Sequence, residues 1–220
     1  MTHSQKLAQA IASGTHRIGE IEIQTEVSNG GFKLCHAYDG TVGTAAESGM
    51  LTVYDGPAAA REIAAYAEDG SYRFLKGQRN LRRGWLLRLA SVEDLRLALD
   101  QFYPACVGLW LAQQDGTLEV TPLRDTLQRQ SGMYRRAQAL DDGALQALVP
   151  HTCGSAIPCA RRILWQIDAH TPLLPSAASR CSGLPDEVAA AGQAIPLLCR
   201  EACNHFVAAC LASAKAVPAG

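Results

Sequence analysis

Cysteines are the residues of this sequence best suited to chemistry, and six of the eight fall after residue 150. The six are Cys153, Cys159, Cys181, Cys199, Cys203 and Cys210. In a reducing compartment, cysteines serve metal ligation, redox chemistry or core packing rather than structural disulfides. Their gathering in one part of the chain predicts a metal or cluster site there.

Four of these cysteines form two closely spaced pairs. Cys153 and Cys159 enclose five residues, a short loop that can wrap around the edge of a cluster. Cys199 and Cys203 follow Pro196, where we expect the final helix to begin, and their spacing places both thiols on one helix face within the first two turns. The unpaired N–H groups and the dipole of a helix N-terminus stabilise thiolates, which favours an anionic cluster at this position.

Spacing alone does not choose the metal. Four thiolates are the usual complement of a 4Fe-4S cluster and also of structural zinc. Cys181 lies in segment 171–192, which is rich in proline, serine, glycine and alanine and is predicted to be a loop. It is therefore either a substitute ligand or an incidental loop thiol.

The remaining three cysteines are predicted to be core residues. Cys210 shares a helix face with Cys203 but lies roughly 10 Å further along the axis at 1.5 Å per residue. Cys35 and Cys106 are isolated from other cysteines and lie beside apolar residues. Unligated cysteine is among the residue types most often buried, so all three favour packing over ligation.

The elements that must position the cysteines follow from hydrophobic periodicity. Ile21 and Ile23 alternate with polar residues, as in a strand with one solvated face, and Ser91 with Asp94 resembles the start of a capped helix. Strands are predicted at 20–27, 32–37, 51–54, 72–75 and 85–89, and helices at 57–70, 91–102, 121–132, 142–148 and from after 196 to about 214.

The predicted fold class is α+β, in two parts. Residues 1–149 are expected to form a mixed domain of sheet and helix, and residues 150–220 a small helical segment that binds the cluster. The boundary is placed at Pro150, because proline is expected to stop the preceding helix just before the first clustered cysteine.

Composition excludes several classes of function. The 220 residues include 48% hydrophobic residues, enough for a real core, and the net charge of −1 provides no basic field for a nucleic-acid binder. No apolar run approaches the roughly 18 residues of a membrane span. The first 19 residues lack the apolar run and cleavage site of a signal peptide, so we expect a cytoplasmic protein with no membrane partner.

Two sets of segments carry a resemblance to a known family. Residues 151–168, which include Ile163-Leu164-Trp165-Gln166-Ile167-Asp168, and residues 197–204 resemble the 4Fe-4S domain of multidomain proteins related to sirohydrochlorin cobaltochelatase. Residues 80–85, 102–104, 121–124 and 132–135 resemble the stabilising domain of the same proteins. The resemblance covers nearly the whole chain apart from its first residues.

The resemblance implies that Cys153, Cys159, Cys199 and Cys203 hold a 4Fe-4S cluster and that the protein is linked to tetrapyrrole metabolism. A chelatase domain does not fit within this chain, so metal insertion would take place on a separate partner. We therefore expect a redox or accessory protein. Its expected partners are a chelatase or another tetrapyrrole-pathway protein, together with an electron donor or acceptor protein.

Two alternatives stay open at this point, and with them the question of whether the chain is an enzyme. The first is an interaction module in which zinc or a cluster only staples the fold. The second is a tetrapyrrole-modifying enzyme that uses the cluster as an electron relay. Arg79, Arg82 and Arg83 with Trp85 could hold the carboxylates of a macrocycle, but a solvated basic loop is the preferred interpretation of this patch.

Overall fold

The computed structural model divides the chain into two compact units, each of which is described by itself. Unit 1 comprises Met1–Gly116 and Asp186–Leu197, and unit 2 comprises Thr117–Pro185 and Leu198–Gly220. The residues described are 1–14, 16–26, 30–40, 51–67, 69–72, 80–130, 132–153, 159–168 and 194–216. The predicted boundary at 149/150 differs from this division, because the helix that contains those residues continues through them and packs within unit 2.

The sheet of unit 1 confirms the predicted α+β class. Its strands are β1 (Arg17–Ile18), β2 (Ile21–Thr25), β3 (Phe32–His36), β4 (Thr52–Asp55), β5 (Trp85–Leu89) and β7 (Ala194–Ile195), in the order β4-β5-β3-β2-β1-β7. The pairs β1–β2, β2–β3 and β3–β5 are antiparallel. At the two edges of the sheet the pairing is parallel, between β4 and β5 and between β7 and β1. Ile21 and Ile23 are buried as predicted, because a strand with one solvated face buries every second residue.

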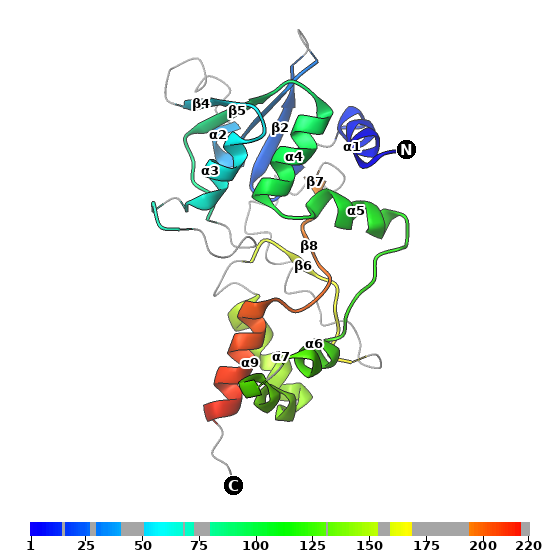
Figure 1. The fold of residues 1–220 in the computed structure, drawn as a ribbon, viewed down its shortest axis with the longest axis vertical. Coiled ribbons are helices and arrows are strands. Elements are labelled where there is room, and N and C mark those ends of the chain that lie inside the picture. Colours follow the sequence, from blue (N-terminus) through cyan, green and yellow to red (C-terminus); the bar gives the residue numbers. More distant parts are fainter. Residues whose placement is uncertain are drawn as a thin grey trace. The chain divides into compact units, whose positions relative to one another are not determined.

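Five helices of unit 1 accompany this sheet in the described part of the chain. They are α1 (His3–Ala12), α2 (Ala37–Gly40), α3 (Ala59–Ala65), α4 (Val92–Phe102) and α5 (Cys106–Gln114), and α3 packs against α4 (Figure 1). The Ser91 hydroxyl accepts a hydrogen bond from the Asp94 N–H at 3.1 Å, which confirms the predicted cap of α4. The predicted helix at 57–70 ends early, because Tyr66 and Ala67 are extended and bridge to Tyr72 and Leu81.

Two predictions in unit 1 are only partly covered by the described residues, namely the strand at 72–75 and the basic patch with Trp85. Of the predicted strand at 72–75 only Tyr72 is described, and Arg79 of the basic patch is not. The ring of Trp85 is buried and stacks on Phe102, with centroids 5.2 Å apart. It therefore has no face available for stacking on a macrocycle.

Cys35 and Cys106 are buried, as the sequence predicts. Burial, with smaller contributions from the carboxylates of Glu22 and Asp39, raises the pKa of the Cys35 thiol from 9.0 to about 12. The unfolded chain therefore loses this proton at lower pH than the folded chain, and the thiol contributes stability below pH 9 that is lost as the pH rises toward about 12.

We accordingly expect the free energy of unfolding of the wild-type protein to fall by up to about 1.4 kcal/mol per pH unit more steeply above pH 9 than that of Cys35→Ala. Urea unfolding of both proteins below and above pH 9 measures the difference. Parallel pH profiles for the two proteins would contradict the prediction.

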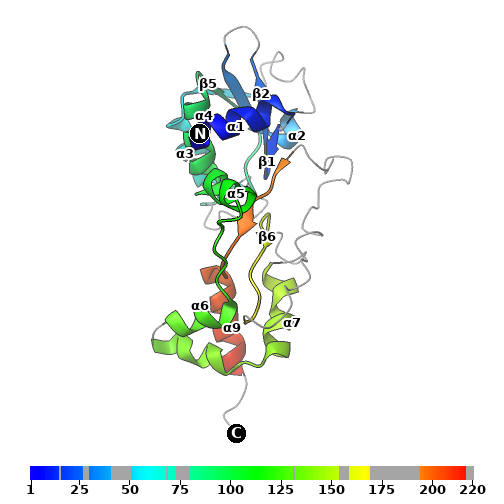
Figure 2. The ribbon, with the colours of Figure 1, turned by 90° about the vertical axis from the view of Figure 1, so that its right-hand side faces the viewer.

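In its described residues, unit 2 contains four helical elements and a small parallel sheet. The elements are α6 (Leu123–Arg129), the 3₁₀ helix η1 (Gly132–Ala139), α7 (Asp142–Thr152), β6 (Arg162–Ile163), β8 (Leu198–Cys199) and α9 (Asn204–Ala216). Helix α9 packs against both η1 and α7, and Figure 2 shows it between them. Strand β6 pairs with β8 through Arg162 with Leu198 and Ile163 with Cys199.

Pro150 does not stop α7, contrary to the prediction. The helix continues to Thr152, and the Cys153 N–H still donates to the Val149 carbonyl at 2.8 Å. The Thr152 hydroxyl donates to the Leu148 carbonyl at 2.8 Å, which closes the last turn around the proline. A proline costs a helix one N–H donor, and packing in unit 2 outweighs this loss.

Within the part of the chain that the structure describes, no helix is both long and apolar enough to cross a membrane.

Candidate metal centre

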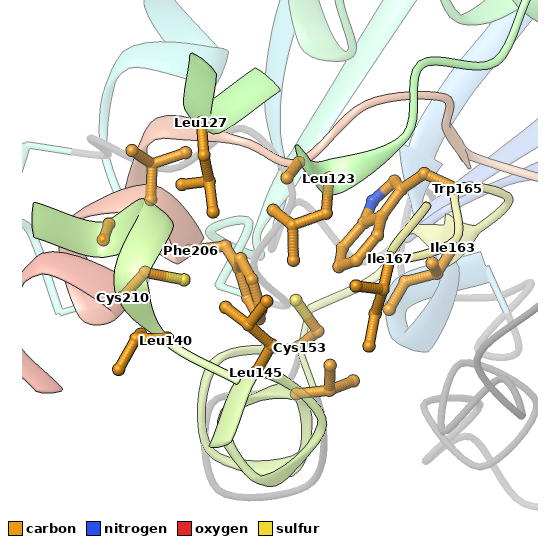
Figure 3. Packing of buried hydrophobic residues seen from close by; sticks show 14 residues of the cluster. Leu123, Leu127, Leu140, Leu145, Cys153, Ile163, Trp165, Ile167, Phe206 and Cys210 are labelled. Carbon is orange, nitrogen blue, oxygen red and sulfur yellow. The ribbon is translucent and has the colours of Figure 1, made fainter. Parts of the chain in front are cut away.

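Cys153 enters the site from the end of α7. Asp141 caps the start of this helix by accepting from the Ala144 N–H at 2.8 Å, and Cys153 stands at the C-cap. Its side chain is 6% exposed and belongs to the apolar core of unit 2, which also holds Trp165 and Phe206 (Figure 3). The first predicted ligand is therefore held at the end of a packed helix.

Cys159 and Cys199 come from two neighbouring segments of the small sheet. Cys199 is the last residue of β8, and its carbonyl accepts from the Leu164 N–H at 3.0 Å. Cys159 precedes the partner strand β6, and the Arg161 side chain between them donates to the Leu198 carbonyl at 3.0 Å. Both cysteines are half-buried, and the pairing of β6 with β8 brings their segments together.

The helix that was predicted to contain Cys199 and Cys203 begins later than predicted. The helix begins at Asn204 rather than after Pro196, because Leu198 and Cys199 pair with β6 instead. The Cys203 carbonyl accepts the first helical hydrogen bond, from the Val207 N–H at 3.0 Å. Cys203 is therefore the N-cap residue of α9, and the predicted effect of a helix N-terminus applies to it but not to Cys199.

The four thiols lie within electrostatic range of one another. Burial, together with negative charge on the other three cysteines, raises the pKa of Cys153 to about 12, although the Thr152 hydroxyl opposes part of the shift. Burial likewise raises the pKa of Cys199 to about 11, with opposing contributions from Trp165 and Arg161. Four thiolates so close together repel one another, so their joint ionisation requires the positive charge of bound metal.

Three polar groups next to the sulfurs were not predicted from the sequence. The Arg161 N–H donates to the Cys159 sulfur at 3.5 Å, and the Thr152 hydroxyl, which donates to the Leu148 carbonyl, lies 3.6 Å from the Cys153 sulfur. The third group is the indole N–H of Trp165, which lowers the pKa of Cys199. The only sequence signal for them was their position within six residues of a clustered cysteine.

These residues fit a 4Fe-4S cluster in their chemistry. Four soft thiolate ligands come from four points of one unit, and an indole N–H without a normal hydrogen bond stands beside one of them. A bound cluster would supply one-electron redox chemistry. Among the described residues, no three histidine, cysteine or acidic side chains form a group that could hold a single metal ion.

Of the two other cysteines in the C-terminal part, the structure describes Cys210 but not Cys181. Cys210 is fully buried in the core of unit 2, and burial raises the pKa of its thiol to about 11, which confirms its assignment to packing. Cys181, the possible substitute ligand, lies with the whole of the predicted loop 171–192 outside the described residues.

Comparison with known proteins identifies both parts of the chain. Residues 3–114 match the family model of the DR2241 stabilising domain, and residues 115–211 match that of a 4Fe-4S iron-sulfur cluster binding domain. The boundary between these matches lies close to the division after Gly116, but the second match also includes Asp186–Leu197, which belong to unit 1. A comparison with curated proteins found no match.

A solved structure covers almost all of the chain. It is that of DR2241 from Deinococcus radiodurans, described as a multi-domain protein with structural similarity to chelatases and with two additional novel domains. The TM-score is 0.72 and the identity 29%, and the match covers 96% of this chain but only 41% of that one. This chain carries a 4Fe-4S cluster binding domain and belongs to the DR2241 stabilising domain family.

Proposed function

We propose that Cys153, Cys159, Cys199 and Cys203 hold the 4Fe-4S cluster and that the protein works as a cytoplasmic redox or accessory protein. The observation that carries the proposal is the exposure of the four cysteines. Cys153 is buried, Cys159 and Cys199 are half-buried, and Cys203 is exposed. A cluster held by such a set has one edge in the core and one at the surface, where an electron donor or acceptor protein can approach.

The second part of the proposal is a link to tetrapyrrole metabolism. It is supported by the likeness of this chain to part of a multi-domain protein that has structural similarity to chelatases. We propose that the partner is a separate chelatase or another protein that handles a tetrapyrrole. The present chain would then supply electrons to the partner or stabilise it.

Anaerobic purification with iron, sulfide and zinc analysis is the first test. We expect a coloured protein with about four irons per chain, because four cysteines complete the coordination of one cubane. Dithionite should bleach it reversibly, and air should restore the colour. A colourless protein with about one zinc per chain would overturn the redox proposal.

The tetrapyrrole link needs a separate measurement. The loaded protein is titrated with a carboxylated tetrapyrrole, alone and together with a chelatase-type protein from the same organism, while binding and the rate of cluster oxidation are followed. Saturable binding of either component, or a faster oxidation, supports the link. If neither component binds nor changes the oxidation rate, the link is rejected while the cluster assignment stands.

A second candidate function is a staple that holds unit 2 together, and one observation favours it. The four cysteines lie at the end of α7, before β6, in β8 and at the start of α9, so one cluster would tie together most of the unit. Removal of the cluster with a chelator after oxidation distinguishes the two functions. A staple predicts that unit 2 unfolds on removal and that reduction of the cluster has no effect on partner binding.

A further inference from the structure

The indole nitrogen of Trp165 is a buried donor without a normal hydrogen bond. The residue is 0% exposed, and among the described residues its Nε1 has no partner of ordinary distance and angle. Buried N–H groups in folded proteins are almost always paired, because an unpaired one loses its bond to water without replacement. The Cys199 side chain is the acceptor available to this N–H, because its interaction with the indole lowers the pKa of Cys199.

The surroundings of Trp165 hold its ring in place. The N–H groups of Leu123 and Arg124, at the start of α6, donate to the carbonyls of Gln166 and Ile167 at 2.8 and 2.9 Å. These bonds fix the backbone directly after Trp165. On its other side, the ring packs against Phe206 with centroids 5.2 Å apart and the ring planes inclined by 58° (Figure 3). The direction of the N–H is therefore set by the fold rather than by a mobile side chain.

Backbone pairing also holds Trp165 beside Cys199. The Leu164 N–H donates to the Cys199 carbonyl, so the residue before Trp165 is bonded directly to the residue that bears this thiol. The Cys199 thiol donates a hydrogen bond to the Glu201 carbonyl at 3.1 Å. Metal ligation removes the thiol proton to solvent and converts the sulfur into a strong acceptor.

We propose that the indole N–H of Trp165 hydrogen-bonds to the Cys199 sulfur of the bound cluster and thereby raises its reduction potential. The inference rests on the proposed ligand set. The physical reason is that reduction adds one negative charge to the cluster. A fixed N–H donor therefore stabilises the reduced state more than the oxidised state.

Trp165→Phe tests the proposal, because phenylalanine keeps an aromatic ring against Phe206 and lacks the N–H. At a fixed solution potential we expect the ratio of reduced to oxidised cluster to fall about tenfold, which is about 59 mV for a one-electron couple. Redox titration followed by electron paramagnetic resonance measures the ratio. An unchanged potential in a Trp165→Phe protein that carries its full iron content would overturn the proposal.

Trp85→Phe is the matched control. Trp85 is also buried and also packs on a phenylalanine at 5.2 Å, but its N–H already donates to the Arg82 carbonyl at 2.7 Å within unit 1. We expect this variant to lower the stability of unit 1 and to leave the potential of the cluster unchanged. An equal shift of the potential in both variants would show that loss of packing, not loss of the N–H, is responsible.

A measurement on the wild-type protein keeps the proposal testable if Trp165→Phe does not load a cluster. The protein is grown with tryptophan labelled with ¹⁵N in the indole ring and reduced, and nuclear couplings to the cluster are recorded. We expect coupling to one indole nitrogen and its exchangeable proton, retained in Trp85→Phe. If the fully loaded wild-type protein shows no such coupling, the inference about Trp165 is wrong and the ligand set is unaffected. If Cys199→Ser keeps its full iron content, Cys199 is not a ligand, and both the ligand set and the inference are wrong.

Discussion

Cys199→Ser is expected to lower the iron content from about four per chain to well below one, because a cubane that loses one of four thiolates is no longer held. A serine hydroxyl ionises far less readily than a thiol and is a poor ligand for iron. Cys199 is half-buried, so the vacated position is poorly placed for a ligand from solvent. Iron and sulfide analysis with the visible spectrum, after anaerobic purification, measures the loss. The same result is expected for Cys153→Ser.

Cys210→Ala is the control for loss of a buried thiol as such. Cys210 is 0% exposed and packs in the core of unit 2 together with Cys153, but it is not among the predicted ligands. The Cys210→Ala substitution should lower the free energy of unfolding by about 1 kcal/mol and leave the iron content unchanged. Cys181→Ser should also retain the iron. If Cys181→Ser loses the cluster and Cys203→Ser keeps it, Cys181 is the fourth ligand and the predicted set is wrong at that position.

Gly19→Ala is expected to lower the stability of unit 1 by about 2–4 kcal/mol, from backbone strain and overpacking together. Gly19 has a φ of +55° in the two-residue turn between β1 and β2. A Cβ there would lie 2.8 Å from the Leu197 side chain and 2.8 Å from the ring of Tyr103. Tyr103 is fully buried and accepts from the Glu20 N–H at 3.1 Å, so its ring has little room to move.

The matched control for this prediction is Gly116→Ala. Gly116 has a φ of +67°, close to that of Gly19, but a Cβ there meets no atom within 4 Å. The backbone cost alone, about 1–2 kcal/mol, is therefore expected at Gly116. Urea or thermal unfolding of both variants separates strain from overpacking. Equal losses at the two positions would show that the close contacts around Gly19 relax at no cost.

Local patterns in the sequence predicted strands β2, β3, β4 and β5 and helices α3 and α4 of unit 1, but not α1, α2, α5, β1 or β7. Strand β2 follows from the alternation around Ile21 and Ile23, and α4 follows from the cap at Ser91 and its apolar stripe. These elements are predictable because burial of every second residue, or of one helix face, leaves a direct trace in the order of residues. The parallel pairing of β4 with β5 leaves no such trace, because it depends on a crossover between segments far apart in the chain.

The sequence by itself determined the cysteine types and spacing, the predicted ligand set and the family resemblance. Tertiary structure alone decided how these residues are held. The segment before Cys203 pairs with β6 instead of joining the helix. The pairing of Ile163 with Cys199 and the hydrogen bond from Leu164 to the Cys199 carbonyl are long-range contacts that local propensity does not encode. The same contacts carry Trp165 to the site, where its unpaired N–H becomes visible only once the burial of its ring is known.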